Sequence, residues 1–175
     1  VFAGPTDVIY LPMETEVIIE GDGRVLIGET AASDLKPVKF IAASEVPVFI
    51  RGAGRESREV RNLGGPEDLD ASRLIVVEVL VPSGNWSGIP AHKHDTYIPG
   101  VESNLEEIYY FETRVAGGAE ITTADPTGYL RVYASDERPI DVTTDVRDGD
   151  VALVPYGWHG PAAATPRSEE RRVGK

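Results

Sequence analysis

Short runs of alternating apolar and polar residues fill most of the chain, and glycine and proline separate them. This alternation is typical of β-strands, because successive side chains of a strand point to opposite faces of its sheet. The 18 glycines and 13 prolines are spread along the whole length, as expected for the turns of a β-sandwich or barrel. We therefore predict an all-β protein. The predicted strands cover residues 16–20, 24–27, 39–42, 48–50, 59–62, 74–81, 108–113, 129–133, 141–146 and 151–155.

The pattern divides the chain into two β units, joined by linker-like segments at residues 33–36 and 43–47. We expect residues 1–45 to be the remnant of an N-terminal domain with its linker, because their first strands lack the beginning of a sheet. Residues 46–165 then form a second β domain. Residues 166–175, PRSEERRVGK, are almost entirely charged and have no strand or helix pattern. We expect a disordered, solvated tail there; the alternative is an extension that replaces a lost C-terminus.

Composition narrows the functional classes. The chain has 175 residues, of which 41% are hydrophobic and 26% charged, and this balance is ordinary for a folded globular core. Its net charge of −12 repels phosphate backbones and anionic lipids, so we expect neither nucleic-acid nor membrane partners. The absence of cysteine excludes disulfides and thiolate metal sites. No apolar run approaches the ~20 residues of a membrane helix and no signal peptide is visible, so the predicted location is cytoplasmic.

Candidate chemistry begins in residues 84–112, GNWSGIPAHKHDTYIPGVESNLEEIYYFE. His92 and His94 are two residues apart, a spacing that places both imidazoles on one face of a strand. Downstream, Glu106 and Glu107 precede an aromatic run with strong strand propensity. If that strand lies beside the histidines, one of the two carboxylates reaches the same point, and the strand period alone does not decide which.

A second stretch, RDGDVALVPYGWHG at residues 147–160, contains a tight turn, a buried strand and then His159. The proline and glycine before His159 form a loop that returns its imidazole to the mouth of the barrel. The chain has only three histidines, and all three fall in these two stretches. Three imidazoles and a carboxylate suit a borderline divalent ion such as Zn²⁺, Mn²⁺ or Fe²⁺ with open coordination positions. We therefore predict one divalent metal site.

The two stretches resemble the paired motifs of the cupin superfamily: a glycine, His-x-His, a glutamate that opens an aromatic strand, and later a proline, a glycine and a closing histidine. More narrowly, GNWSGIPAHKHD, SNLEEIYYFE, LRVYASDERPID and VRDGDVALVPYGWH are similar to the 5-deoxy-glucuronate isomerase family of two-cupin proteins. The similarity runs from about Val1 to about Gly160. In that pattern the carboxylate ligand immediately precedes the Ile-Tyr pair, which selects Glu107 over Glu106.

This resemblance implies a cupin fold, a double-stranded β-helix or jelly-roll barrel, in a bicupin with a truncated N-terminal domain and an incomplete C-terminal barrel. It also implies a metal site formed by His92, His94, Glu107 and His159, with Zn, Mn or Fe as the cofactor. The implied reaction is the aldose–ketose isomerisation of 5-deoxy-glucuronate to 2-deoxy-5-keto-gluconate in inositol catabolism. The implied partners are a small uronic-acid substrate and further copies of the chain in a homo-oligomer. Phe111 departs from the pattern, which has a more polar residue there, often tyrosine.

Proton transfer between adjacent carbons needs an acid or base besides the three metal-bound imidazoles. The candidate catalytic residues are Tyr109, Arg131 and Tyr133, and the last two share one face of a predicted strand. If that face points inward, Arg131 can hold the substrate carboxylate in bidentate fashion. A metal-assisted hydride shift would need no base. Lys93, between two inward histidines, is expected to point outward.

Two other functions fit the same four ligands. A cupin dioxygenase that uses Fe²⁺ has the same ligand set, and a sugar-binding cupin binds its ligand without turnover. The residues of these motifs other than the four ligands favour the isomerase.

Overall fold

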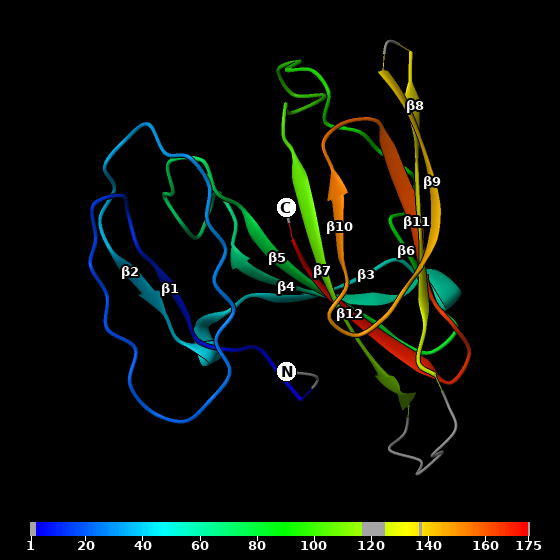
Figure 1. Cartoon of the computed structure of the whole chain (residues 1–175), viewed down its shortest axis with the longest axis horizontal. Helices are drawn as coiled ribbons and strands as arrows, with labels where there is room; N and C mark the ends of the chain where they lie inside the picture. Colours follow the sequence, from blue (N-terminus) through cyan, green and yellow to red (C-terminus); the bar gives the residue numbers. More distant parts are fainter. Residues whose placement is uncertain (1–2, 117–124, 137, 175) are drawn as a thin grey trace.

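The computed structural model describes residues 3–116, 125–136 and 138–174. Within these ranges the regular secondary structure consists of β-strands, as predicted, apart from two short 3-10 turns, η1 (Ala43–Glu45) and η2 (Gly54–Glu56). Figure 1 shows two sheets facing each other in a barrel-like body and a smaller N-terminal part beside it. The predicted cupin class, an all-β jelly-roll barrel, is confirmed by this arrangement and by the structural relative described below. None of the described helices is long and apolar enough to cross a membrane.

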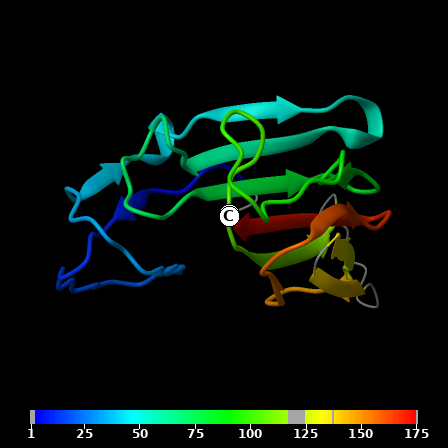
Figure 2. The same cartoon turned by 90° about the horizontal axis from the view of Figure 1, so that it is seen from above.

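The N-terminal part is a two-stranded antiparallel sheet of β1 (Val8–Tyr10) and β2 (Lys39–Ile41). Residues 11–38 connect them and contain no strand within the described chain, so the strands predicted at 16–20 and 24–27 are wrong. Their apolar side chains face solvent; Ile18, for example, is 79% exposed. A strand needs backbone hydrogen bonds to a neighbouring strand, and within the described chain this connection pairs with none. Figures 1 and 2 show residues 11–38 as a long connection on the outside of the N-terminal part.

A six-stranded sheet forms the long layer of the barrel-like body. Its strand order is β10-β7-β12-β5-β4-β3, and every neighbouring pair is antiparallel. Figure 2 shows these strands stacked side by side from above. The bounds are β3 (Val48–Arg51), β4 (Arg58–Gly64), β5 (Val76–Val81), β7 (Glu107–Val115), β10 (Val151–Val154) and β12 (Ser168–Gly174).

The second sheet has four antiparallel strands in the order β6-β11-β8-β9. Its strands are β6 (Trp86–Ser87), β8 (Gly128–Ser135), β9 (Arg138–Val146) and β11 (Trp158–Ala164). One core cluster fills the space between the sheets, and it takes side chains from both. The buried members are Tyr109, Phe111, Leu130, Val132, Val146, Val154 and Ala162. The core therefore holds β7 of one sheet against β8 and β11 of the other.

A second, smaller cluster joins the N-terminal part to the barrel-like body. Ile41 and Val46 pack there with Leu63 of β4. These residues come from both sides of the predicted boundary at residue 45, so the two predicted domains share apolar contacts at that point. The division into 1–45 and 46–165 stays a prediction, as does the truncated bicupin.

The C-terminal residues correct the predicted disordered tail. Residues 168–174 form β12, which pairs with β7 on one side and β5 on the other. Without it, β7 and β5 would both present unpaired N–H and C=O groups along an inner edge. Backbone hydrogen bonding to two open edges therefore sets the conformation of this segment, although its side chains carry no strand pattern.

Charged side chains cross the outer face of the six-stranded sheet. The guanidinium of Arg61, only 2% exposed, donates to Glu78 Oε2 at 2.7 Å. Arg171 of β12 contacts the same carboxylate and also lies 3.2 Å from Glu112, which pairs with Arg24 of the N-terminal part. Removing one partner of a buried ion pair leaves an uncompensated charge, so these residues depend on one another for stability.

The buried Glu170 of β12 should make the stability of the fold depend on pH. It is 0% exposed, and among the described residues its Oε2 has no hydrogen-bond partner. Burial raises the pKa of its carboxyl, and the charge of Arg172 opposes that rise. The folded state therefore keeps the proton where the unfolded state has lost it, and stability falls as the pH rises above the ordinary value of 4.5.

We expect Glu170→Gln to remove this pH dependence, because the amide keeps the shape without the charge. Urea denaturation near pH 4 and near pH 7 should show a smaller loss of unfolding free energy for the variant than for the wild type. Glu169→Gln, on the same strand but paired with Arg114 at 2.6 Å, is the control. Equal pH slopes for Glu170→Gln and the wild type would contradict the expectation.

Candidate metal centre

Four side chains converge between the two sheets. His92, His94, Glu107 and His159 each offer one ligand atom, and these atoms all lie within 4.8 Å of one another. The imidazole centroids are 4.3 to 5.4 Å apart. The structure therefore brings together all four of the predicted ligands.

Backbone pairing between the two motifs positions His92 and His159. The His92 N–H donates to the His159 carbonyl at 3.2 Å, and the His159 N–H donates back at 2.9 Å. Gly160 permits this close approach: it has a φ of +106°, and a Cβ there would lie 2.1 Å from the Gly88 carbonyl oxygen. The His-x-His stretch forms only this isolated bridge and no regular strand, so its two imidazoles meet through loop geometry rather than through strand alternation.

His94 and Glu107 are positioned from the start of β7. The N–H of Leu105 donates to the His94 carbonyl at 3.0 Å, which ties the histidine loop to the residues just before the strand. Glu107 is 2% exposed and points into the barrel-like body, whereas Glu106 is exposed. The choice of Glu107 over Glu106 thus agrees with the side of β7 that each residue occupies.

Two imidazoles have their outer nitrogen against a backbone carbonyl. Nδ1 of His92 lies 3.3 Å from the Pro90 oxygen, and Nδ1 of His159 lies 3.4 Å from the Gly157 oxygen. A proton on Nδ1 in each ring leaves the Nε2 lone pair facing the cluster, which is the usual arrangement for a histidine ligand.

The polar atoms at the centre fit a cation. Nε2 of His94 and Nε2 of His159 lie 3.1 Å and 3.3 Å from the two oxygens of Glu107. Among the described residues, neither ring nitrogen of His94 has a hydrogen-bond partner of good geometry. Buried polar atoms without partners are costly, and a divalent ion would coordinate them. The donor set of three imidazoles and one carboxylate suits Zn²⁺, Mn²⁺ or Fe²⁺.

A cavity of about 480 Å³ opens beside the cluster, a size that accommodates a small metabolite. Its lining includes His92, Glu107 and Tyr109, and also Arg58 and Val60 of β4, a strand that β12 and β5 separate from β7. Burial raises the pKa of the Tyr109 phenol; the charge of Arg172 lowers it and that of Glu107 raises it further. The cluster and the cavity together form a site with room for a ligand next to the metal position.

The sequence profile of the KduI/IolB family matches residues 1–169. The chain belongs to the KduI/IolB family. Two relatives are named 5-deoxy-glucuronate isomerase: the Geobacillus kaustophilus protein is 40% identical over 163 residues, and the Geobacillus thermodenitrificans protein is 44% identical over 133 residues. These alignments cover 92% and 76% of this chain, and 55% and 44% of the relatives.

The KduI/IolB assignment has a structural counterpart. The crystal structure of an IolB-like protein from Salmonella typhimurium is similar, with a TM-score of 0.67 and 36% identity over 85% of this chain and 50% of that one. The chain thus spans about half the length of the curated relatives it matches.

Two predicted substrate contacts of this KduI/IolB chain are corrected by the structure. On β8, Leu130 and Val132 point into the core, so the alternating Arg131 and Tyr133 lie on the outer face of the sheet. Arg131 pairs there with the exposed Asp141. Strand alternation predicts that Arg131 and Tyr133 share a face, but it does not predict the direction of that face. In the structure this face points away from the histidines. Tyr109, in contrast, lines the cavity and lies 6.2 Å from the His159 ring.

Three further polar or aromatic side chains near the two motifs lie outside the cluster. Lys93 points away from it, as expected, and its Nζ is 2.8 Å from both oxygens of Glu102. Trp86 is 44% exposed on β6, and Arg147 pairs with acidic side chains at a turn.

Asp95 helps to position the KduI/IolB site, and the sequence did not lead us to predict this. Its Oδ1 accepts the Gly157 N–H at 2.7 Å, and this bond joins the His-x-His loop to the loop before His159. The signal in the sequence is the acidic residue directly after the second histidine.

We expect Asp95→Ala to weaken metal binding by about 10- to 100-fold, as the loss of an outer-shell contact does. Titration of the apo protein with Mn²⁺ would measure this. Asp136→Ala, a change of the same type at a residue outside the cluster, serves as the control. An unchanged affinity for Asp95→Ala would show that Asp95 does not position the ligands.

Proposed function

We propose that this chain carries the catalytic metal site of an aldose–ketose isomerase that converts 5-deoxy-glucuronate to 2-deoxy-5-keto-gluconate. The carrying observation is the convergence of His92, His94, Glu107 and His159 to within 4.8 Å in a family whose members include isomerases with that name. The adjoining cavity is consistent with a sugar acid of this size.

The proposed chemistry needs hydrogen to move between two adjacent carbons without a net change of oxidation state. A divalent ion, when bound, supplies Lewis-acid polarisation of the carbonyl and the neighbouring hydroxyl. His92, His94, Glu107 and His159 would hold that ion beside the cavity. The Tyr109 hydroxyl, which lines the same cavity as Glu107, can donate a hydrogen bond to a substrate oxygen.

The test is to supply 5-deoxy-glucuronate to the chain loaded in turn with Mn²⁺, Zn²⁺ and Fe²⁺, and to follow the ketose product by NMR. We expect turnover with at least one ion and none after His94→Ala. Binding without turnover for every ion would favour a sugar-binding protein, and oxygen consumption with Fe²⁺ would favour a dioxygenase.

We also propose that the protein assembles with copies of itself. The exposed apolar side chains in residues 11–38 support this, for example Ile27 and Leu35, each 68% exposed. Contiguous exposed apolar surface commonly marks an association site. Light scattering after size exclusion would decide, and a monomer at all concentrations would contradict the proposal.

A further inference from the structure

The wall of the cavity away from the metal ligands carries a guanidinium group. Arg58 opens β4, and Arg58 and Val60 line the cavity together with Val77 and Val79 of β5. The alternate residues of β4 point to the other face, where Arg61 pairs with Glu78. Strand alternation therefore turns Arg58 toward the same space as His92 and Glu107.

The loop before β4 fixes the direction of this side chain. Nη1 of Arg58 donates to the Glu56 carbonyl at 3.1 Å. Gly52, with a φ of +76°, provides room for it, because a Cβ at Gly52 would lie 2.8 Å from Nη1 and 2.3 Å from the Glu56 oxygen. Both the left-handed backbone and the close approach favour glycine here.

Among the residues that the structure describes, Arg58 forms no salt bridge, and its guanidinium donates to a neutral backbone carbonyl. Burial lowers the pKa of its guanidinium, and the like charge of Arg172 lowers it further. The charge of Glu56 raises the pKa of the Arg58 guanidinium, but Glu56 contacts it through its backbone carbonyl and not as an ion pair. Arg172, the other cation at the cavity, already contacts Ser87 at 2.7 Å and Glu170 at 3.4 Å.

We propose that Arg58 binds the carboxylate of the sugar-acid substrate, at the opposite side of the cavity from the metal ligands. This inference rests on the proposed function, since it names the group that selects a uronic acid over a neutral sugar. A guanidinium matches a carboxylate with two parallel hydrogen bonds, and partial burial strengthens them. With one end of the substrate on the metal and the other on Arg58, the reacting carbons are held in a single orientation.

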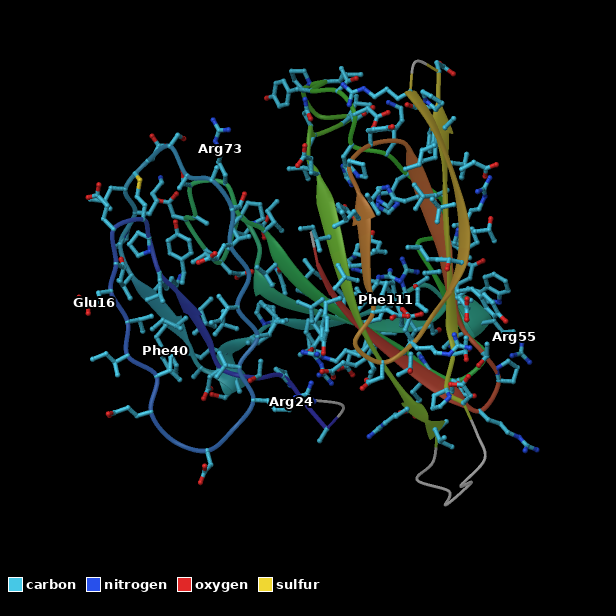
Figure 3. The ribbon with its side chains drawn as sticks, in the orientation of Figure 1. Glu16, Arg24, Phe40, Arg55, Arg73 and Phe111 are labelled. Atoms are coloured by element: carbon cyan, nitrogen blue, oxygen red, sulfur yellow. The ribbon has the colours of Figure 1, made fainter. Side chains whose placement is uncertain are left out.

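The test uses two probes that differ in one group, D-glucuronate and D-glucose, titrated calorimetrically into the Mn²⁺-loaded chain. We expect the wild type to prefer D-glucuronate. Arg58→Gln should weaken D-glucuronate binding by about 10- to 100-fold, as the loss of charged hydrogen bonds does, and should leave D-glucose binding unchanged. Arg55→Gln is the matched control, because Arg55 is exposed on the outside, as Figure 3 shows.

Chemical modification provides a measurement on the wild type, so that the decision does not depend on the folding of a variant. Phenylglyoxal reacts with accessible arginines, and mass spectrometry locates the product. We expect D-glucuronate, but not D-glucose, to protect Arg58, while Arg55 reacts equally in both. Absence of this protection, no preference of the wild type for D-glucuronate, or equal weakening of both sugars by Arg58→Gln would each overturn the inference.

These outcomes separate the inference from the proposed function. A chain that does not isomerise 5-deoxy-glucuronate but binds D-glucuronate through Arg58 would leave the carboxylate site standing and remove the isomerase. Isomerase activity with an unchanged KM in Arg58→Gln would keep the proposed function and remove the role of Arg58.

Discussion

Mn²⁺ and Zn²⁺ are expected to bind the Glu107→Gln variant more than about 100-fold more weakly than the wild type. The change replaces the one anionic ligand with a neutral amide of the same shape, so the three imidazoles are left to hold a doubly charged ion. Outer-shell changes alone cost 10- to 100-fold, and loss of a direct ligand should exceed that range. Isomerase activity should disappear with the metal.

Glu106→Gln is the matched control, because it makes the same chemical change one residue earlier on the exposed side of the chain. Its metal affinity should equal that of the wild type. Competition with a chelator measures both affinities, and thermal melts with and without Mn²⁺ provide a second readout, since an ion that binds the folded state raises the Tm. A Glu107→Gln variant that keeps the metal, or a Glu106→Gln variant that loses it, would refute the ligand assignment.

The second large effect is expected for Phe111→Ala. Phe111 is 0% exposed in the cluster between the two sheets, and its ring meets that of Tyr109 edge to face at a centroid distance of 6.1 Å. Removing the ring leaves a cavity in the main core and should cost about 3–5 kcal/mol in the free energy of unfolding. Metal affinity should also fall, because Tyr109 and Glu107 lie on the same strand.

Phe40→Ala is the control, because it is the same substitution at a side chain that is 60% exposed on β2. Figure 3 shows Phe40 on the outer N-terminal part and Phe111 between the sheets. We expect Phe40→Ala to cost less than about 1 kcal/mol. Urea denaturation compares the two variants, and similar losses would mean that the cluster around Phe111 does not dominate stability.

The metal ligands were predictable because their signal is local and redundant. The His-x-His pair, the glutamate before an aromatic strand and the proline-glycine loop before His159 are each readable over a few residues. The chain also has no other histidine that could compete for the assignment. Seven strands of the barrel-like body were predicted for a similar reason, since alternation with glycine and proline breaks is a local pattern. They are β3, β4, β5, β7, β8, β9 and β10, whereas β6 and β11 were not predicted.

The periodicity of β8 did not allow us to predict which of its two faces is buried. Alternation shows that Arg131 and Tyr133 share a face, but it does not say which face the other sheet covers. Packing decides this: Leu130 and Val132 enter the core cluster, so the polar face turns outward. Arg58 shows the reverse case, because it is a charged residue on an apolar, inward face, and no short motif marks it.

The position of β12 required information from distant residues. Its sequence favours a solvated segment, and its conformation follows from two strand edges that are formed by residues 76–81 and 107–115. The predicted strands at 16–20 and 24–27 are wrong for the opposite reason, since they have the side-chain pattern but pair with no strand of the described chain. Local pattern and partner availability are separate conditions, and a strand needs both.

The place of β12 also affects how the chain folds. It follows every other described strand in the sequence, yet it occupies an inner position, where Glu170 lies opposite Val81 and Thr113. The sheet cannot close until this segment has left the ribosome and has closed two long loops, which is entropically slow. Until then β5 and β7 remain open to pairing with other chains, so nascent copies are vulnerable to aggregation at this stage of synthesis.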